Sequence, residues 1–299
     1  MLQPRLRLLF QIVPALAISA CSSTQMGNSA ASSATASAVP ATGVSAASQA
    51  LPPDADHALA RLNSSPRHGE WAMISLSPTD SLRAWVVYPE RKTKAPVVVV
   101  IHEIYGLTPW IRAVADQLAA DGFIAIAPDF LTMKNLTRVA DSVATQDAVS
   151  ATRTVDPDEI QRQIDAAARY AMALPSAQHR YGVVGFCWGG GISFAHATHS
   201  PSLGASVVYY GVSPKTEALS MVHAPVLGLY GGSDARVDAT IPPADSALHA
   251  MGKTYYHSVF DGAGHGFLRQ QTGMNGANMT ATQQAWPATI AWFKRYLDS

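Results

Sequence analysis

The sequence predicts an α/β fold in which a doubly wound, mostly parallel sheet carries helices on both faces. Short, continuous apolar runs at 96–101, 123–127 and 181–186 are typical of parallel strands that are buried on both faces. Apolar residues at helical spacing over 111–120 and 158–174 indicate helices between these runs. Because strand and helix alternate along the chain, we expect an open, doubly wound sheet.

The first half of the fold begins with a predicted hairpin. Residues 71–76 and 82–88 alternate with a period of two and flank a Ser-Pro-Thr-Asp turn, which favours an antiparallel pair. Two buried strands and their connecting helix follow. Residues 131–157 are polar and lack strong periodicity. A long segment in this position can form a cap over a site at the C-terminal edge of the sheet.

The second half repeats the strand–helix rhythm. Asp158 and Glu159 lie in the first turn of the predicted helix 158–174, where acidic side chains complement the helix dipole. A closing helix is expected over the last residues, beginning near Pro287, which a first helical turn accepts. The remaining predicted elements are a helix at 192–199, strands at 205–210 and 225–230, a helix at 243–251 and a strand at 254–260.

The N-terminal segment 1–21 has the features of an export signal. Two arginines precede an apolar stretch that is too short to span a bilayer, and small residues precede Cys21. This end resembles a bacterial lipobox, in which cleavage leaves Cys21 as a lipid-carrying N-terminus. Ordinary cleavage after Ala20 is the alternative. We therefore expect an exported protein of the bacterial cell envelope, lipid-anchored and facing the periplasm, or else soluble in the periplasm.

Residues 22–57 are mostly Ser, Ala, Thr, Gly and Pro and predict a disordered tether, because they cannot bury enough apolar surface to offset their ordering entropy. Residues 58–299 are then expected to form one α/β domain. The 21 basic residues balance the 21 acidic ones over the whole chain. No basic patch occurs, which argues against nucleic acid as a partner. We expect a monomer that contacts the membrane through the lipid alone.

Residues 185–189 read Gly-Phe-Cys-Trp-Gly, the cysteine form of a nucleophile elbow. In such an elbow a sharp strand-to-helix turn exposes the nucleophile, and glycine lets the two backbones approach closely. Cys187 would lie at a helix N-terminus, which favours a thiolate. A buried structural cysteine is the alternative. If Cys21 carries lipid, however, Cys187 has no partner for an intrachain disulfide, and nucleophilic catalysis would explain its presence.

A catalytic cysteine needs a base and an orienting acid, which follow the nucleophile in the order acid, histidine in elbow-type folds. Asp234 comes directly after the predicted strand 225–230, and His265 lies in a glycine-flanked loop after the strand 254–260. Asp238 is a second candidate for the acid. The alternatives are that Asp234 only forms a turn and that His265 is a surface histidine.

The loop after the first buried strand is expected to supply the second N–H group of an oxyanion hole. Ile104 would provide this donor, and Trp188 the one after the nucleophile. Glu103 would point a carboxylate at the thiol, unless it is simply a solvent-exposed loop acid. No histidine is spaced from Cys, Asp or Glu as metal ligands are, so we expect no metal and no cofactor.

Six short motifs together resemble the dienelactone hydrolase family, in order and in spacing over about residues 70–297. The resemblance implies an α/β-hydrolase fold and hydrolysis of an enol-lactone, 4-carboxymethylenebut-2-en-4-olide, to maleylacetate. The motifs are His-Glu-Ile-Tyr-Gly at 102–106, Ala-Pro-Asp-Phe at 127–130, Gly-Phe-Cys-Trp-Gly-Gly at 185–190, Tyr-Tyr-Gly at 209–211, Gly-Gly-Ser-Asp at 231–234 and Gly-His-Gly-Phe at 264–267.

The resemblance also implies roles for single residues. Cys187 matches the nucleophile, His265 the base, Asp234 its orienting acid, and Glu103 an extra acid that holds the thiol at rest and accepts its proton when substrate binds. Arg269 matches an arginine that grips a substrate carboxylate, which suits a guanidinium fork. Arg138 and Arg153 are both candidates for a second such arginine, and Tyr105 is expected to contact the substrate. As a departure from the family, Tyr105 and Trp188 are bulky residues beside the site and would narrow it.

The chain departs from the family pattern in its signal, its tether and a polar insert at 270–284. These departures leave the substrate open: a small, anionic ester or lactone is expected, processed outside the cytoplasm. A general carboxylesterase of the envelope is the first alternative. A lipoprotein that binds a ligand on a hydrolase scaffold without catalysis is the second.

Overall fold

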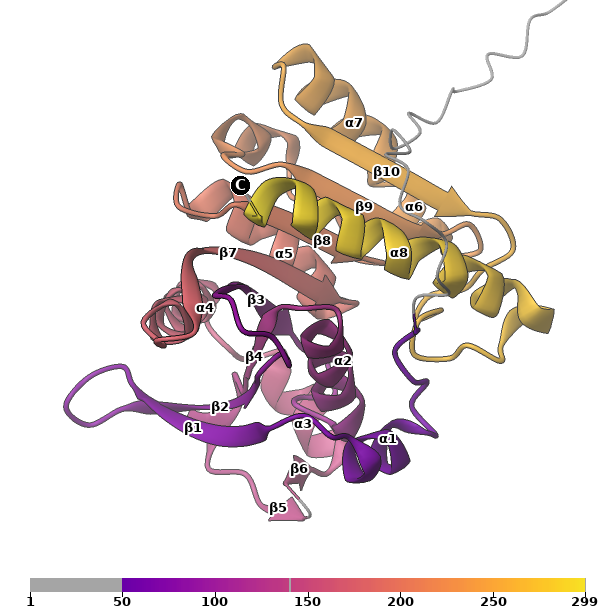
Figure 1. Cartoon of the computed structure of the whole chain (residues 1–299). Helices are drawn as coiled ribbons and strands as arrows, with labels where there is room; N and C mark the ends of the chain where they lie inside the picture. The colour runs from indigo at the N-terminus through magenta and orange to yellow at the C-terminus, as the bar shows by residue number, and fades with distance from the viewer. Residues whose placement is uncertain (1–49, 140, 299) are drawn as a thin grey trace, which may run out of the picture. The chain divides into compact units, whose positions relative to one another are not determined.

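The computed structural model describes residues 50–139 and 141–298 (Figure 1). The predicted signal, Cys21 and the tether up to residue 49 lie outside the described residues. One sheet runs in the order β1-β2-β4-β3-β7-β8-β9-β10, and every neighbouring pair from β4 to β10 is parallel. Its strands are β1 (Gly69–Ser75), β2 (Ser81–Val87), β3 (Ala95–Ile101), β4 (Ile124–Pro128), β7 (Ala177–Phe186), β8 (Ala205–Tyr209), β9 (Val226–Gly231) and β10 (Tyr255–Phe260).

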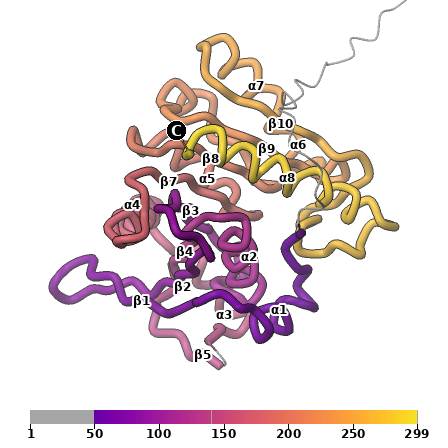
Figure 2. The backbone as a smooth tube through the Cα atoms, viewed as in Figure 1, coloured from indigo at the N-terminus to yellow at the C-terminus, as the bar shows by residue number. Residues whose placement is uncertain are grey.

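The predicted fold class is confirmed, because helices cover both faces of this sheet. Alternate residues of β3 enter two separate apolar clusters: Val97 and Val99 pack with α4 and α5, whereas Val98 and Val100 pack with α2 and α8. In Figure 2 the chain can be followed to α8, which lies against β8 and β9. The helices are α1 (Ala58–Ser64), α2 (Pro109–Ala120), α3 (Thr145–Thr152), α4 (Pro157–Met172), α5 (Trp188–His199), α6 (Ala235–Asp238), α7 (Ile241–Ala250) and α8 (Ala277–Leu297).

The predicted hairpin is present as the antiparallel pair β1–β2, and β2 pairs antiparallel with β4. Residues before the predicted end of the tether at residue 57 already pack against the domain. The carbonyl of Pro53 accepts a hydrogen bond from Trp110 Nε1 at 3.0 Å, and the N–H of Ala55 donates to the Arg269 carbonyl at 3.0 Å. Helix α1, which the sequence analysis did not predict, follows and packs on α2. The packed part of the described chain therefore includes residues 50–57.

The closing helix α8 begins at Ala277, so the prediction of a start near Pro287 was wrong. Pro287 lies inside the helix and removes only one backbone hydrogen bond. The segment 270–284, which the sequence analysis treated as a polar insert, hydrogen-bonds the loop that contains His265. The Asn278 side chain accepts from the Gly264 N–H at 2.9 Å and donates to the Gln270 carbonyl at 2.7 Å. Three of its polar residues, Gln271, Asn278 and Thr282, are therefore buried against the rest of the domain.

The segment 131–157 contains regular structure that its weak periodicity concealed: a 3₁₀ turn (Thr132–Lys134), the two-residue strands β5 (Arg138–Val139) and β6 (Ser142–Val143), and helix α3. Asp141, between β5 and β6, hydrogen-bonds Arg83 of β2, whose guanidinium stacks 3.4 Å above the centre of the Trp71 ring. These contacts fasten the segment to the sheet. At its other end, α3 packs against the loop that follows β3.

Candidate active site

Cys187 stands in a strained turn between β7 and α5. Its φ of 58° and ψ of −116° are unusual for a residue with a side chain. Glycine is required on both sides: a Cβ on Gly185 would come 1.8 Å from the Gly189 carbonyl oxygen, and one on Gly189 would come 2.4 Å from the His102 carbonyl oxygen. The turn therefore has the geometry of the elbow expected from the sequence, and it leaves Cys187 a free, partly exposed cysteine.

Two backbone N–H groups interact with the Cys187 sulfur. They belong to Trp188, at the start of α5, and to Ile104, in the loop after β3, and each lowers the pKa of the thiol. Burial has a larger, opposite effect, and the Glu103 charge adds to it, so the pKa of Cys187 lies above its ordinary value of 9.0. At neutral pH the resting group is therefore a thiol.

Asp234 and His265 meet through a hydrogen bond between Asp234 Oδ2 and His265 Nδ1. Asp234 follows β9 and His265 follows β10, and these adjacent parallel strands end at the same edge of the sheet. The Asp234 side chain is buried, whereas that of His265 is 35% exposed. Asp238 is not the partner of the imidazole, and its pKa is raised by burial and by the charge of Asp234. Of the two candidate acids, Asp234 is the one that contacts the imidazole within the described residues.

The buried residue Tyr210 contacts the ring of His265 and interacts electrostatically with Cys187. Its ring centre is 5.2 Å from that of His265, and the charges of Glu103 and Cys187 raise the pKa of its hydroxyl beyond the rise that burial causes. The Cys187 N–H also donates to the Tyr209 carbonyl at 3.1 Å. Thiol and imidazole are therefore grouped around one tyrosine, although no hydrogen bond joins them directly within the described residues. Sequence reasoning noticed the Tyr-Tyr-Gly motif but gave Tyr210 no role.

Glu103 lies inside the site, only 3% exposed, and is not a solvent-exposed loop acid. Burial raises the pKa of its carboxyl to about 7, and the positive charge of Arg269 limits that rise. Arg269 Nε is 3.3 Å from Glu103 Oε2, and its guanidinium lies 5.0 Å from the centre of the Tyr105 ring. Arg269 thus contacts both the carboxylate and the tyrosine predicted for this site.

The two remaining arginine candidates have no contact with this group in the described residues. Arg153 is exposed at the C-terminal end of α3, and Arg138 pairs with Asp129 at 2.5 Å. Arg236 of α6, which the sequence analysis missed, instead acts electrostatically on the Cys187 sulfur and lowers the pKa of the thiol. Its position two residues after Asp234 was the available signal.

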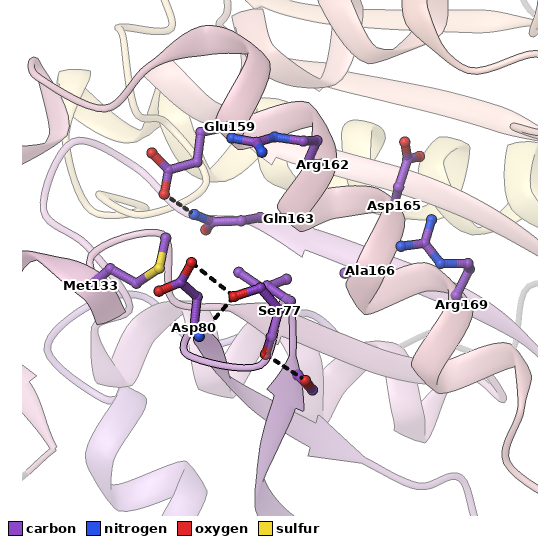
Figure 3. Close-up of a pocket in the computed structure, with 11 residues that line it drawn as sticks. Ser77, Asp80, Met133, Glu159, Arg162, Gln163, Asp165, Ala166 and Arg169 are labelled. Atoms are coloured by element: carbon purple, nitrogen blue, oxygen red, sulfur yellow. Dashed lines mark hydrogen bonds between the residues drawn. The ribbon is translucent and has the colours of Figure 1, made fainter.

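A separate groove of about 440 Å³ lies between the β1–β2 turn and α4 (Figure 3). It is lined by charged side chains such as Asp80, Glu159 and Arg169, and Gln163 donates to Glu159 within it. None of the predicted site residues lines it. Among the described residues, no group of three or more His, Cys, Asp or Glu side chains could hold a metal ion.

The parallel sheet, the strained elbow and the polar residues gathered at the ends of its strands define a carboxylic ester or lactone hydrolase of the α/β-hydrolase fold. The profile of the dienelactone hydrolase family matches residues 82–297, and the chain belongs to that family. This finding confirms the resemblance seen in the motifs.

Known relatives and structures agree. A protein of Methylorubrum extorquens with the provisional name carboxymethylenebutenolidase is 32% identical over 232 residues, which cover 71% of this chain and 76% of that one. An Escherichia coli K12 protein with the same provisional name is 30% identical over 233 residues, covering 74% and 84%. A crystal structure from Klebsiella pneumoniae, provisionally a dienelactone hydrolase, superposes with a TM-score of 0.66 at 27% identity, covering 77% of this chain and all of the other.

Proposed function

We propose that this chain hydrolyses a lactone or an activated carboxylic ester, as a dienelactone hydrolase does, through a thioester on Cys187. One observation carries the proposal: the strained Cys187, whose sulfur interacts with the N–H groups of Ile104 and Trp188, lies at the edge of the sheet where His265 meets Asp234. A sulfur in this position has donors for an oxyanion on one side and a base with its orienting acid nearby.

The first step requires a proton to leave the thiol, and Glu103 is the base that the electrostatics favour. Arg269 lowers the pKa of Glu103 through its charge. A substrate carboxylate that binds Arg269 draws the guanidinium away from Glu103. The pKa of Glu103 then rises, so the Glu103 carboxylate takes the proton from Sγ of Cys187. An anionic substrate would in this way activate its own nucleophile.

Acylation then follows at the elbow. The thiolate forms a bond to the carbonyl carbon, and the carbonyl electron pair moves to oxygen, where the N–H groups of Ile104 and Trp188 hold it. A preorganised donor of this kind stabilises a transition state by about 3 to 4 kcal/mol. When the oxyanion collapses, the C–O bond breaks and the enolate or alkoxide leaves. An enolate needs little protonation, which suits a cysteine nucleophile to enol-lactones and activated esters.

Deacylation uses water and His265. The imidazole takes a proton from water, the hydroxide adds to the thioester carbonyl, and the C–S bond breaks to return Cys187 and release the acid. Asp234 stabilises the imidazolium that forms, since its carboxylate faces Nδ1. The thiolate regains its proton from Glu103, and the imidazolium gives its proton to the enolate or alkoxide that left. The cycle then closes, and water is the only co-substrate consumed.

Substrate choice separates an enol-lactonase from a general carboxylesterase. We expect a higher kcat/KM for an anionic enol-lactone than for neutral p-nitrophenyl esters, because Arg269 and Arg236 both place positive charge at the site. Replacing Cys187 by Ala should abolish turnover of every ester tested. Unchanged turnover in the Cys187→Ala variant would contradict the proposal. A wild-type preference for large neutral esters would be consistent with Cys187 as the nucleophile but would contradict the expectation of an anionic substrate.

We further propose that the chain is held at the envelope membrane by lipid on Cys21. Support comes from the lipobox-like end of the apolar segment 8–18. In the part of the chain that the structure describes, no helix is long and apolar enough to cross a bilayer. Labelling with radioactive palmitate should mark the wild type and not Cys21→Ser, and the unlabelled variant should leave the membrane fraction. Equal labelling of both proteins, or a wild type that stays in the cytoplasm, would contradict this.

A further inference from the structure

The imidazole of His102 has a hydrogen bond that the proposed mechanism does not use. His102 follows β3, is 0% exposed, and places Nδ1 2.7 Å from the Glu103 carbonyl oxygen. A carbonyl oxygen can only accept, so Nδ1 carries the proton and donates. Burial lowers the pKa of His102, which keeps the ring neutral and leaves Nε2 unprotonated.

The bonded carbonyl belongs to the peptide group that supplies one oxyanion donor. The Glu103 C=O and the Ile104 N–H are the two ends of one planar, trans peptide and point in opposite directions. Holding the carbonyl therefore fixes the direction in which the N–H points, toward Cys187. The Gly106 N–H also donates to this carbonyl, at 3.2 Å. A hydrogen bond accepted at the C=O polarises the peptide and strengthens its N–H as a donor.

The same ring also contacts the other donor residue. It stacks on Trp188, with ring centres 5.6 Å apart and planes 23° from parallel, and meets the edge of Phe130 at 5.1 Å. His102 therefore lies between the loop that presents the Ile104 N–H and the elbow that presents the Trp188 N–H.

Space filling alone does not account for a histidine here. Within the described residues, Nε2 has no hydrogen-bond partner, and a buried acceptor without a donor lowers the stability of the fold. A phenylalanine would fill this space and stack on Trp188 without that cost. The property that only the histidine supplies is the Nδ1–H donor.

A second side chain holds the next peptide of the loop. Thr152 of α3, 2% exposed, donates from Oγ1 to the Ile104 carbonyl at 3.2 Å. The two carbonyls that flank the Cα of Ile104 are thus both fixed, one by His102 and one by Thr152.

We propose that His102 is a positioning residue of the oxyanion hole, which orients and polarises the Ile104 N–H through its bond to the Glu103 carbonyl while its ring supports Trp188. The inference rests on the proposed function, because it needs an oxyanion at these N–H groups. Thr152 assists by holding the following peptide.

The test compares His102→Asn with His102→Gln. The amide nitrogen of asparagine is bonded to Cγ, as Nδ1 is, and can reach the Glu103 carbonyl, whereas that of glutamine lies one bond further, near the place of Nε2. We expect His102→Gln to lower kcat and kcat/KM equally, by about tenfold, with KM unchanged, as for an interaction made in the transition state. His102→Asn should stay within about threefold of wild type, since it keeps the donor.

A thionoester probe distinguishes positioning from general damage. Sulfur accepts hydrogen bonds weakly, so the wild type should favour a phenyl ester over its thiono analogue, and His102→Gln should reduce that ratio. Equal losses in the two variants with an unchanged ratio would overturn the inference, and so would full activity in His102→Gln. If Cys187→Ala keeps its activity, the proposed function fails instead, which is a separate outcome.

Thr152 provides an independent check. Thr152→Val removes the hydroxyl and keeps the shape, so kcat should fall about three- to fivefold, and Thr152→Ser should restore it. Thr154→Val is the matched control, because the Thr154 hydroxyl bonds the Ala151 carbonyl at an exposed position. Equal rates in the Val and Ser variants of Thr152 would show that its hydroxyl does not position the Ile104 peptide.

Discussion

The two N–H groups that face Cys187 are positioned in different ways. The Trp188 donor belongs to the elbow, where two glycines allow backbones to approach so closely that no side chain fits. The Ile104 donor belongs to the loop 102–106, where the side chains of His102, in the loop itself, and of Thr152, in α3, hold the peptides. Backbone sterics make the first donor rigid and intolerant of substitution, whereas hydrogen bonds make the second adjustable in small steps. Substitutions in the two regions should therefore differ in both size and character.

The largest effect is expected at the elbow. Gly185→Ala places a methyl group 1.8 Å from the Gly189 carbonyl oxygen, so the turn cannot form as it stands. We expect a loss of activity of at least about 100-fold with a lower melting temperature, measured by ester hydrolysis and thermal unfolding. Gly191→Ala is the control: its Cβ would meet Val212 at an ordinary 3.4 Å, and alanine should stabilise α5 by up to about 1 kcal/mol. An active, stable Gly185→Ala would show that the elbow is less constrained than described.

The acid of the histidine pair comes next. Asp234→Asn leaves the shape but removes the charge that orients His265 and stabilises the imidazolium, so kcat should fall about 10³-fold. Asp238→Asn, four residues on, should stay within about threefold, because its carboxyl does not contact the imidazole. Similar losses in both variants would mean that the two carboxyls share the role. The comparison needs only single-turnover rates with one ester.

Glu103 precedes Ile104 in the loop, and its charge acts on Cys187 in the elbow. Its titration should therefore make both stability and activity depend on pH. Its pKa of about 7 lies above the ordinary 4.5, so the folded protein binds this proton more tightly than the unfolded chain does. Stability is therefore lost as pH rises from about 4.5 through about 7, by about 3 kcal/mol. Activity should rise over the upper part of this range as the base is freed.

Glu103→Gln should flatten both profiles, remain more stable than wild type at pH 8, and lose most turnover of anionic substrates. Denaturant unfolding and kcat measured between pH 5 and 9 provide the test. A Gln variant that keeps the pH dependence of the wild type would place the titrating group elsewhere.

The smallest effect concerns Arg236. Its charge lowers the pKa of the Cys187 thiol, so Arg236→Gln should raise that pKa and slow alkylation by iodoacetamide at pH 7.5 about two- to threefold. Arg162→Gln, an exposed arginine of the groove on α4, is the matched control and should change nothing. Faster alkylation in Arg236→Gln would contradict the direction of the effect.

Two features of the site could be predicted from the sequence: the close approach of the backbones at the elbow, and the sheet edge that Asp234 and His265 share. Glycines around Cys187 predict a close approach, and Asp234 and His265 follow apolar runs, so their shared edge of the sheet could be expected. The roles of Thr152 and Asn278 could not, because each depends on a contact between segments that the periodicity does not connect. The early start of α8 was hidden for the same reason: inward-facing polar residues of 270–284 look like a loop until their partners are known. Helix α1 is too short to give a strong pattern.

The central claim is that Cys187 carries the acyl group during turnover. The most direct measurement is mass spectrometry of the His265→Ala variant after a brief pulse of an activated ester or enol-lactone, since without the imidazole deacylation should be slow. The account predicts one acyl group, located on the peptide that contains Cys187 and absent from Cys187→Ala. An acyl group on another residue, or continued turnover by the Cys187→Ala variant, would contradict it.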